Sequence, residues 1–216
     1  KLSIKYALAT SSCTGALTLA LSSLNLNIND EIILADINWI SSVSAINQAK
    51  LKPIFVDIDK KSWCICPKSF EKSISKNTKA VLVTHLYGNI ANIYEISKIA
   101  KKHNLYIIED SAEALGSKLD NKYVGTFGDI GCFSFHGTKT ITTGEGGIIV
   151  TNKKKIFQKI LNLNNLGINP KKQFYCDNLG YKFKMSNLQA ALGISQFKKL
   201  DKIIKKKRVI FFTYKK

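Results

Sequence analysis

The sequence predicts an α/β domain with a doubly wound, mostly parallel sheet. Two observations support this fold class: short apolar runs recur along the chain, and segments with helical periodicity separate most of them. The 216 residues are 45% hydrophobic, which is enough to bury a sizeable core around one sheet. The chain shows no internal repeat and no low-complexity linker.

In the first half of the chain, most apolar runs are followed by a turn and a helical segment. The runs predict strands at 6–10, 31–35, 52–56, 80–83 and 105–108. Helices are predicted from the Ser/Thr-rich turn at 11–14 to about residue 24, and then at 40–48, 67–74 and 93–103.

The second half begins with a turn-rich excursion at 122–128. Apolar runs then predict strands at 132–135 and 148–150. An irregular stretch at 167–179 contains no sustained periodicity, and Ser186 is a typical N-cap. Helices are predicted at 153–164, from Ser186 through 194, and at 200–214.

The net charge of +18 at pH 7 indicates a cationic surface that favours anionic substrates. It does not indicate nucleic-acid binding, because Arg208 is the only arginine, and arginine is the usual reader of guanine and phosphate. No apolar run approaches membrane-spanning length, so no membrane association is expected. The five cysteines lack metal-binding spacing, so we expect no metal site, reduced thiols and a cytoplasmic location.

Lys139 follows an apolar run and lies among small and hydroxyl residues, so it is not a solvated charge on a helix. One hypothesis is a Walker A loop, which needs adjacent Gly-Lys and a following helix N-terminus that holds phosphate. Here Thr138 separates Gly137 from Lys139, and a glycine turn and a strand follow. The pattern therefore favours an amine that forms a Schiff base and works with an electron-sink cofactor.

Three other positions have a functional and a structural interpretation. The hydroxyl residues at 11–14 suit an anion site at a helix start, but an ordinary N-cap explains them more simply. Trp39 follows a strand, where it either lines a ligand site or packs in the core. Asp110 ends an apolar run and is either a surface turn acid or the partner of a pyridine nitrogen.

A series of motifs extends over nearly the whole chain, and their order is highly specific although each one alone is weak. The motifs are Ser12-Cys13-Thr14-Gly15-Ala16-Leu17, Asn38-Trp39-Ile40, Val56-Asp57-Ile58, His85-Leu86-Tyr87-Gly88, Glu109-Asp110, Gly128-Asp129, Ser134-Phe135-His136, Lys139, Thr143-Gly144-Glu145-Gly146-Gly147 and Met185-Ser186-Asn187-Leu188-Gln189-Ala190-Ala191. In this order they resemble the DegT/DnrJ/EryC1/StrS family of pyridoxal-phosphate-dependent sugar aminotransferases.

The resemblance implies two catalytic residues. Lys139 matches the lysine that forms a Schiff base with pyridoxal 5'-phosphate and later moves a proton between substrate and cofactor. Asp110 matches the acid that keeps the pyridine nitrogen protonated. The remaining cofactor contacts that the resemblance implies are Trp39 on the ring face, Cys13, Thr14 and Ser134 around the phosphate, and Glu113 facing the phenolic oxygen.

Lys182 departs from the family pattern. The family usually has Asn at this position, and that side chain reaches the phosphate of the neighbouring subunit. A lysine ammonium can still bind phosphate as a point charge, so Lys182 is retained as a cofactor-binding candidate. The resemblance therefore implies a homodimer with a shared active site.

The resemblance also implies the domain organisation and the reaction. Residues 1–198 correspond to the large domain of aminotransferase fold type I, and 199–216 begin the helix that connects to a C-terminal small domain, most of which this chain would lack. Because it begins without Met and ends in a basic run, we interpret the chain as a fragment. The implied reaction moves an amino group from glutamate, leaving 2-oxoglutarate, to a nucleotide-linked 4-keto-6-deoxy sugar for surface polysaccharide synthesis.

Two alternatives remain open at this point. A pyridoxamine-dependent sugar dehydratase has the same fold, but such relatives replace the lysine, commonly with His, whereas Lys139 is present here. A non-catalytic member of the family is the other.

Overall fold

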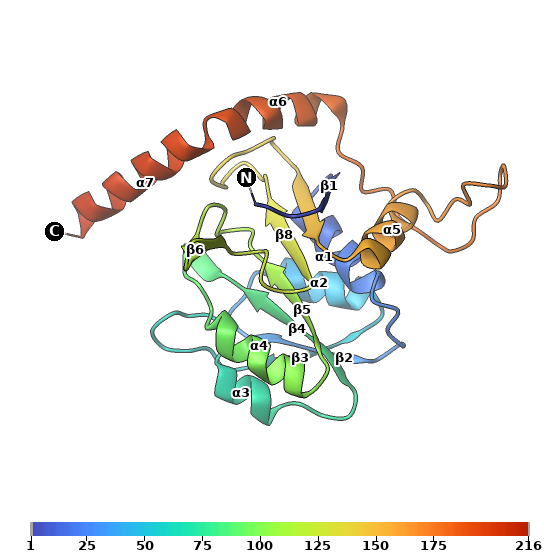
Figure 1. Ribbon diagram of the computed structural model, residues 1–216, viewed down its shortest axis with the longest axis horizontal. Helices are drawn as coiled ribbons and strands as arrows, with labels where there is room; N and C mark the ends of the chain where they lie inside the picture. Colours follow the sequence, from blue (N-terminus) through green and yellow to red (C-terminus); the bar gives the residue numbers. More distant parts are fainter. Residues whose placement is uncertain (1, 216) are drawn as a thin grey trace.

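The computed structural model describes residues 2–215 as an α/β fold built on one large mixed sheet (Figure 1). Within these residues, seven strands form the sheet in the order β1-β9-β8-β5-β4-β2-β3. The strands are β1 (Tyr6–Thr10), β2 (Glu31–Ala35), β3 (Lys52–Val56), β4 (Thr78–Thr84), β5 (Tyr106–Asp110), β8 (Ile130–Ser134) and β9 (Gly147–Thr151). The predicted fold class, α/β with a mostly parallel sheet, is confirmed.

The direction of the strands brings many loops to one edge of the sheet. Strands β3, β2, β4, β5 and β8 are parallel to one another, whereas β9 is antiparallel to both β8 and β1. The carboxyl ends of β1 and of the five parallel strands therefore lie at the same edge, and β9 begins there. Open α/β sheets bind ligands at this edge.

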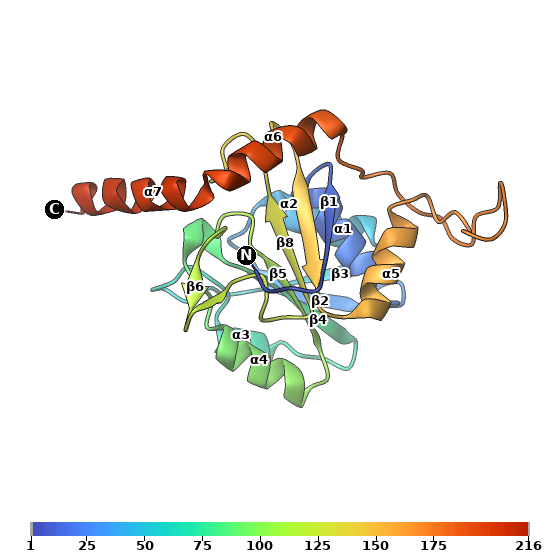
Figure 2. The ribbon, with the colours of Figure 1, turned by 45° about the horizontal axis from the view of Figure 1, so that its top comes forward.

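Helices cover both faces of the sheet, which explains why its strands are apolar almost throughout. One face packs against α1 (Cys13–Ser22), α2 (Ile40–Gln48) and α5 (Lys154–Leu163), and the other against α3 (Pro67–Lys72) and α4 (Ile93–Lys102) (Figures 1 and 2). Successive residues of β2 alternate between these layers: Ile32 and Leu34 face α1 and α2, whereas Ile33 and Ala35 face the α3 and α4 side.

The observed elements differ from the predicted ones mainly at strand ends. Strand β5 continues to Asp110, two residues beyond the predicted end, because its pairing with β8 persists to the pair Asp110 and Cys132. Strand β4 exceeds the predicted 80–83 by Thr78 and Lys79 at its start and by Thr84 at its end. A small antiparallel hairpin of β6 (Lys118–Leu119) and β7 (Lys122–Tyr123) occupies part of the turn-rich excursion.

The last two helices lie at the rim of the fold. Helix α6 (Asn187–Lys198) begins at Ser186, whose hydroxyl accepts the Gln189 N–H while the Gln189 side chain accepts the Ser186 N–H. Helix α7 (Leu200–Tyr214) extends away from the sheet (Figure 2). Among residues 2–215, no helix is long and apolar enough to cross a membrane.

Candidate active site

A cavity of about 450 Å³ lies at the carboxyl edge of the sheet. Its walls come from the segments that follow β1, β2, β3, β4, β5 and β8, so residues distant in sequence meet there. Seven of the eight predicted site residues line it: Cys13, Thr14, Trp39, Asp110, Glu113, Ser134 and Lys139. Among these seven residues are an amine, two carboxylates, an aromatic ring and hydroxyl groups, a combination suited to a polar ligand.

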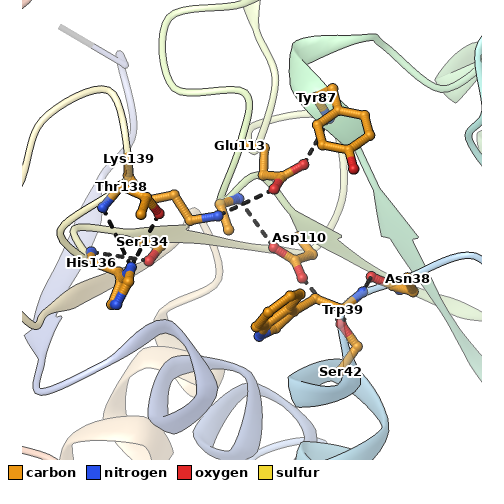
Figure 3. Close-up of polar contacts among 11 residues, drawn as sticks. Asn38, Trp39, Ser42, Tyr87, Asp110, Glu113, Ser134, His136, Thr138 and Lys139 are labelled. Carbon is orange, nitrogen blue, oxygen red and sulfur yellow. Dashed lines mark hydrogen bonds and ion pairs between the residues drawn. The ribbon is translucent and has the colours of Figure 1, made fainter.

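Lys139 projects into this cavity from the loop between β8 and β9 (Figure 3). The next element is strand β9 rather than a helix, so the structure lacks the helix N-terminus that a Walker A lysine needs. The Lys139 Nζ lies 3.3 Å from Glu113 Oε1, and the lysine side chain is 22% exposed. The amine is therefore held by a carboxylate and is accessible from the cavity.

Asp110 lies at the end of β5, on the strand next to the one that precedes Lys139. The residue is only 4% exposed, and burial raises the pKa of its carboxyl group. The Ala112 N–H, the Ser42 hydroxyl and the positive charge of Lys139 oppose that rise in pKa. The Ala112 N–H donates to Oδ1 at 3.1 Å and the Ser42 hydroxyl to Oδ2 at 3.2 Å. These two donors fix the orientation of the carboxylate.

Glu113 connects Lys139 to the loop that follows β4. Its Oε2 accepts the Tyr87 backbone N–H at 2.8 Å, while its Oε1 faces Lys139. Tyr87 has a left-handed backbone with φ 53°, which turns its N–H towards the carboxylate (Figure 3). Glu113 is thus positioned by one main-chain donor and one side-chain cation.

The N-terminus of α1 provides free donors at another wall of the cavity. Ser12 is the N-cap, and its hydroxyl accepts the Gly15 N–H at 3.0 Å. The N–H groups of Cys13 and Thr14 have no acceptor among residues 2–215, as the first turn of a helix leads one to expect. Helix N-termini with free amides bind phosphate, and Thr14 adds a hydroxyl group. This wall could hold the phosphate of a cofactor.

Trp39 and Lys182 have different surroundings. Trp39 is the N-cap of α2 and is 75% exposed, so its indole is an open wall of the cavity rather than a core residue. Lys182 is also exposed, but it does not line the cavity of its own chain. It belongs to a segment beside the end of β1, where Ser11 N–H donates to Phe183 O at 2.7 Å. A contact between Lys182 and a neighbouring subunit stays a prediction.

Several residues that shape this site were given no role from the sequence. Ser42 orients Asp110, and Asn38 donates through Nδ2 to Thr84 Oγ1 at 2.9 Å, which ties the Trp39 turn to β4. Ser42 lies one helical turn after Asn38. The position of a polar residue in the first turn of a helix, one turn after Asn38, was the only sequence signal that could have indicated a role for Ser42.

A buried charged network lies behind the site. Glu109 is fully buried, and its carboxylate accepts three backbone N–H groups, from Gly125, Phe127 and Gly128 at 2.7, 2.6 and 2.6 Å. His85 Nε2 lies 3.0 Å from the same carboxylate, while its Nδ1 is 3.3 Å from the Ala91 N. Both contacts are satisfied by the neutral tautomer with hydrogen on Nε2, because Nδ1 must accept.

The fold and this cavity define an α/β domain in which a lysine from the loop after β8 and a buried carboxylate at the end of the adjacent strand β5 face one ligand site. The chain belongs to the DegT/DnrJ/EryC1/StrS aminotransferase family, whose model matches residues 1–216. It is 44% identical over 213 residues to a GDP-perosamine synthase of Escherichia coli O157:H7 and 41% identical over 214 residues to one of Vibrio cholerae. Each alignment covers 99% of this chain and 58% of the relative.

Solved structures confirm fold type I. Helicobacter pylori PseC, an aminotransferase of pseudoaminic acid biosynthesis, superposes with a TM-score of 0.87 at 33% identity, over 93% of this chain and 55% of PseC. The Escherichia coli GDP-4-keto-6-deoxy-D-mannose-3-dehydratase with bound hydrated PLP has a TM-score of 0.86 at 32% identity, over 93% and 57%. The chain therefore spans somewhat more than half the length of these relatives.

Within the family, the sequence at residues 11–14, 63–65 and 111–113 also resembles that of the GDP-perosamine synthases. The two curated relatives agree with that resemblance.

Proposed function

We propose that the protein is a pyridoxal-phosphate-dependent aminotransferase that converts a nucleotide-linked 4-keto-6-deoxy sugar to the 4-amino sugar. The proposal includes glutamate as amino donor, with 2-oxoglutarate as its product. The observation that carries it is the arrangement of Lys139, on the loop after β8, and Asp110, at the end of the adjacent parallel strand β5, which enter one cavity beside a free helix N-terminus. The GDP-perosamine synthases among the relatives support the substrate class.

The residues of the cavity fit the cofactor. The unpaired amides of Cys13 and Thr14 suit a phosphate, and Ser134 lies on the same side, at the end of β8. Asp110 is buried and oriented by two donors, as the partner of a protonated pyridine nitrogen must be. Trp39 presents its exposed indole as a surface for an aromatic ring, and Glu113 adds a carboxylate beside the Lys139 amine.

When bound, pyridoxal phosphate acts as an electron sink for the substrate carbon that loses a proton. The chain supplies the groups that bind it and move that proton. Lys139 would hold the cofactor through its Nζ and, as a free amine, would take the proton from the substrate and return it. The Asp110 carboxylate would be the partner of the pyridine nitrogen and would favour its protonated form.

The assembly, the domain organisation and the location of the protein are also part of what we propose. The active form is a homodimer in which Lys182 contacts the cofactor phosphate of the neighbouring subunit. Residues 1–198 form the cofactor-binding domain, and 199–216 begin the connection to a further domain. The enzyme works in the cytoplasm, where nucleotide sugars for surface polysaccharides are made.

Absorbance spectroscopy with borohydride trapping tests the proposal. Added pyridoxal phosphate should give a visible band, and borohydride followed by peptide mapping should place the label on the peptide with Lys139. Glutamate should bleach the band of the unreduced protein. In the Lys139→His variant the band and transamination should both be lost, whereas Lys159→His, on helix α5, should leave them intact. Labelling of another lysine would refute the role of Lys139.

A further inference from the structure

Trp63 is a large aromatic residue at the rim of the same cavity. Its side chain lines the cavity and is 51% exposed, whereas the next two residues, Cys64 and Ile65, are buried. Its backbone is left-handed with φ 60°, a conformation that costs a bulky side chain about 1–2 kcal/mol. The turn therefore presents an indole at a position where glycine or asparagine would be more comfortable.

Hydrogen bonds within the turn hold Trp63 in place. Its N–H donates to Asp59 O at 2.8 Å, and the Asp59 N–H donates to Cys64 O at 2.8 Å. The Asp59 carboxylate accepts the Ser62 N–H and hydroxyl, both at 2.9 Å. Asn89, from the loop after β4, donates through Nδ2 to Ser62 O at 3.1 Å. Because the turn is closed internally and tied to a second loop, the backbone that carries the indole is preorganised for binding.

The segment that carries Trp63 leaves the sheet far from the segment that carries Lys139. The Trp63 turn follows β3 at the edge of the sheet, whereas Lys139 follows β8, four strands away in the order β8-β5-β4-β2-β3. With neighbouring strands about 4.8 Å apart, the two segments leave the sheet about 19 Å from each other. Trp63 and Lys139 therefore belong to different walls of the cavity, and an elongated ligand can contact one with each end.

We infer that Trp63 is a stacking platform for the nucleobase of the nucleotide-linked substrate. This inference rests on the proposed function, because a nucleoside diphosphate sugar with its sugar at Lys139 carries its base at the opposite end. Aromatic side chains stack on every nucleobase through its π-face. Lys60 and Lys61 are exposed on the same turn and provide positive charge for the diphosphate. Trp63 thereby acts on substrate affinity and has no part in proton transfer.

Titration of the cofactor-loaded protein with GDP tests this inference. Trp63→Ala should weaken GDP binding by about 5- to 20-fold, and Trp63→Phe should retain most of the affinity. Phe55→Ala is the matched control, because Phe55 is also half exposed (52%), lies on β3 and does not line the cavity. Its GDP affinity should equal that of the wild type.

Steady-state kinetics should show the same division. In Trp63→Ala, the KM for the nucleotide sugar should rise by a similar factor while kcat is unchanged, as expected for loss of uniform binding. Bleaching of the cofactor band by glutamate, which involves no nucleotide, should proceed at the wild-type rate.

Each contrary outcome is informative. Equal GDP affinity in wild type and Trp63→Ala would overturn the inference, and a raised KM without a loss of GDP affinity would mean that Trp63 contacts the sugar. Wild-type protein that binds no GDP would overturn it as well. In each of these cases the bleaching of the cofactor band by glutamate in the same sample separates the failure of this inference from that of the proposed function.

Discussion

The buried carboxylate of Glu109 is expected to be one of the largest single contributions to stability in this fold. Its Oε1 accepts the N–H groups of Phe127 and Gly128, and its Oε2 accepts the Gly125 N–H and faces His85 Nε2. In Glu109→Gln, one of these oxygens becomes an NH₂ group. In either orientation of the amide, its NH₂ group faces two N–H donors. An NH₂ group cannot accept a hydrogen bond from them.

The magnitude follows from these two lost acceptors. A buried polar group that is left without a partner costs about 1–3 kcal/mol, so two such groups cost about 2–6 kcal/mol. Disruption of a buried charged network usually costs about 3–5 kcal/mol, which lies within the same range. We therefore expect the free energy of unfolding of Glu109→Gln to fall by about 4 kcal/mol.

Equilibrium unfolding in urea, followed by far-UV circular dichroism, measures this change. Glu113→Gln is the matched control, because its carboxylate is 30% exposed and contacts one backbone N–H and the Lys139 amine. Its unfolding free energy should change by no more than about 1 kcal/mol. If Glu109→Gln were as stable as Glu113→Gln, the hydrogen-bond network assigned to Glu109 would be wrong.

Three further predictions follow from the site. Burial raises the pKa of Asp110, so the folded protein favours the protonated carboxyl group. The stability that this protonated group contributes to the fold is fully present below the unfolded pKa near 3.9, and it is lost as the pH rises through the higher folded pKa. Asp110→Asn should therefore raise the Tm of the cofactor-free protein at pH 7 but not at pH 3, and an unchanged Tm at pH 7 would contradict the raised pKa. The same variant should lower kcat about 10²–10³-fold. Burial raises the pKa of the Cys13 thiol well above its usual value, so iodoacetamide should label exposed Cys176 first, as mass spectrometry would show. Gly147→Ala would place a Cβ 2.7 Å from the Ser12 carbonyl. This clash should weaken phosphate binding at the N-terminus of α1, and it should lower the free energy of unfolding in urea by about 1–3 kcal/mol.

Apolar strands were predictable from the sequence, both the fully buried β2 and the partly exposed edge strands β1 and β3. The runs at 6–10, 31–35 and 52–56 are apolar and coincide with β1, β2 and β3. The end of β5 was not predicted, since Glu109 and Asp110 are charged and hydropathy therefore ends the strand too early. Pairing with β8 overrides that signal. The hairpin of β6 and β7 has two residues in each strand, which is too short for any periodicity.

The candidate site was predictable in its composition but not in its geometry. Motif resemblance selected seven residues that line one cavity, and strand order explains why they meet there. The Tyr87 amide and Ser42 could not be assigned, because their contacts with Glu113 and Asp110 join segments more than 25 residues apart on loop and helix ends. Backbone donors in particular have no signature in a sequence.

The two consecutive acids at the end of β5 show how one strand can serve both stability and function. Successive side chains of a strand point to opposite faces, so Glu109 and Asp110 cannot share an environment. Glu109 meets three N–H donors of the 125–128 loop and is satisfied within the protein. Asp110 has two donors and an open side towards the cavity, and burial disfavours its charge. The acid that the fold leaves incompletely paired is therefore the one available to bind a cationic ring nitrogen, and its cost to the unliganded protein is repaid on binding.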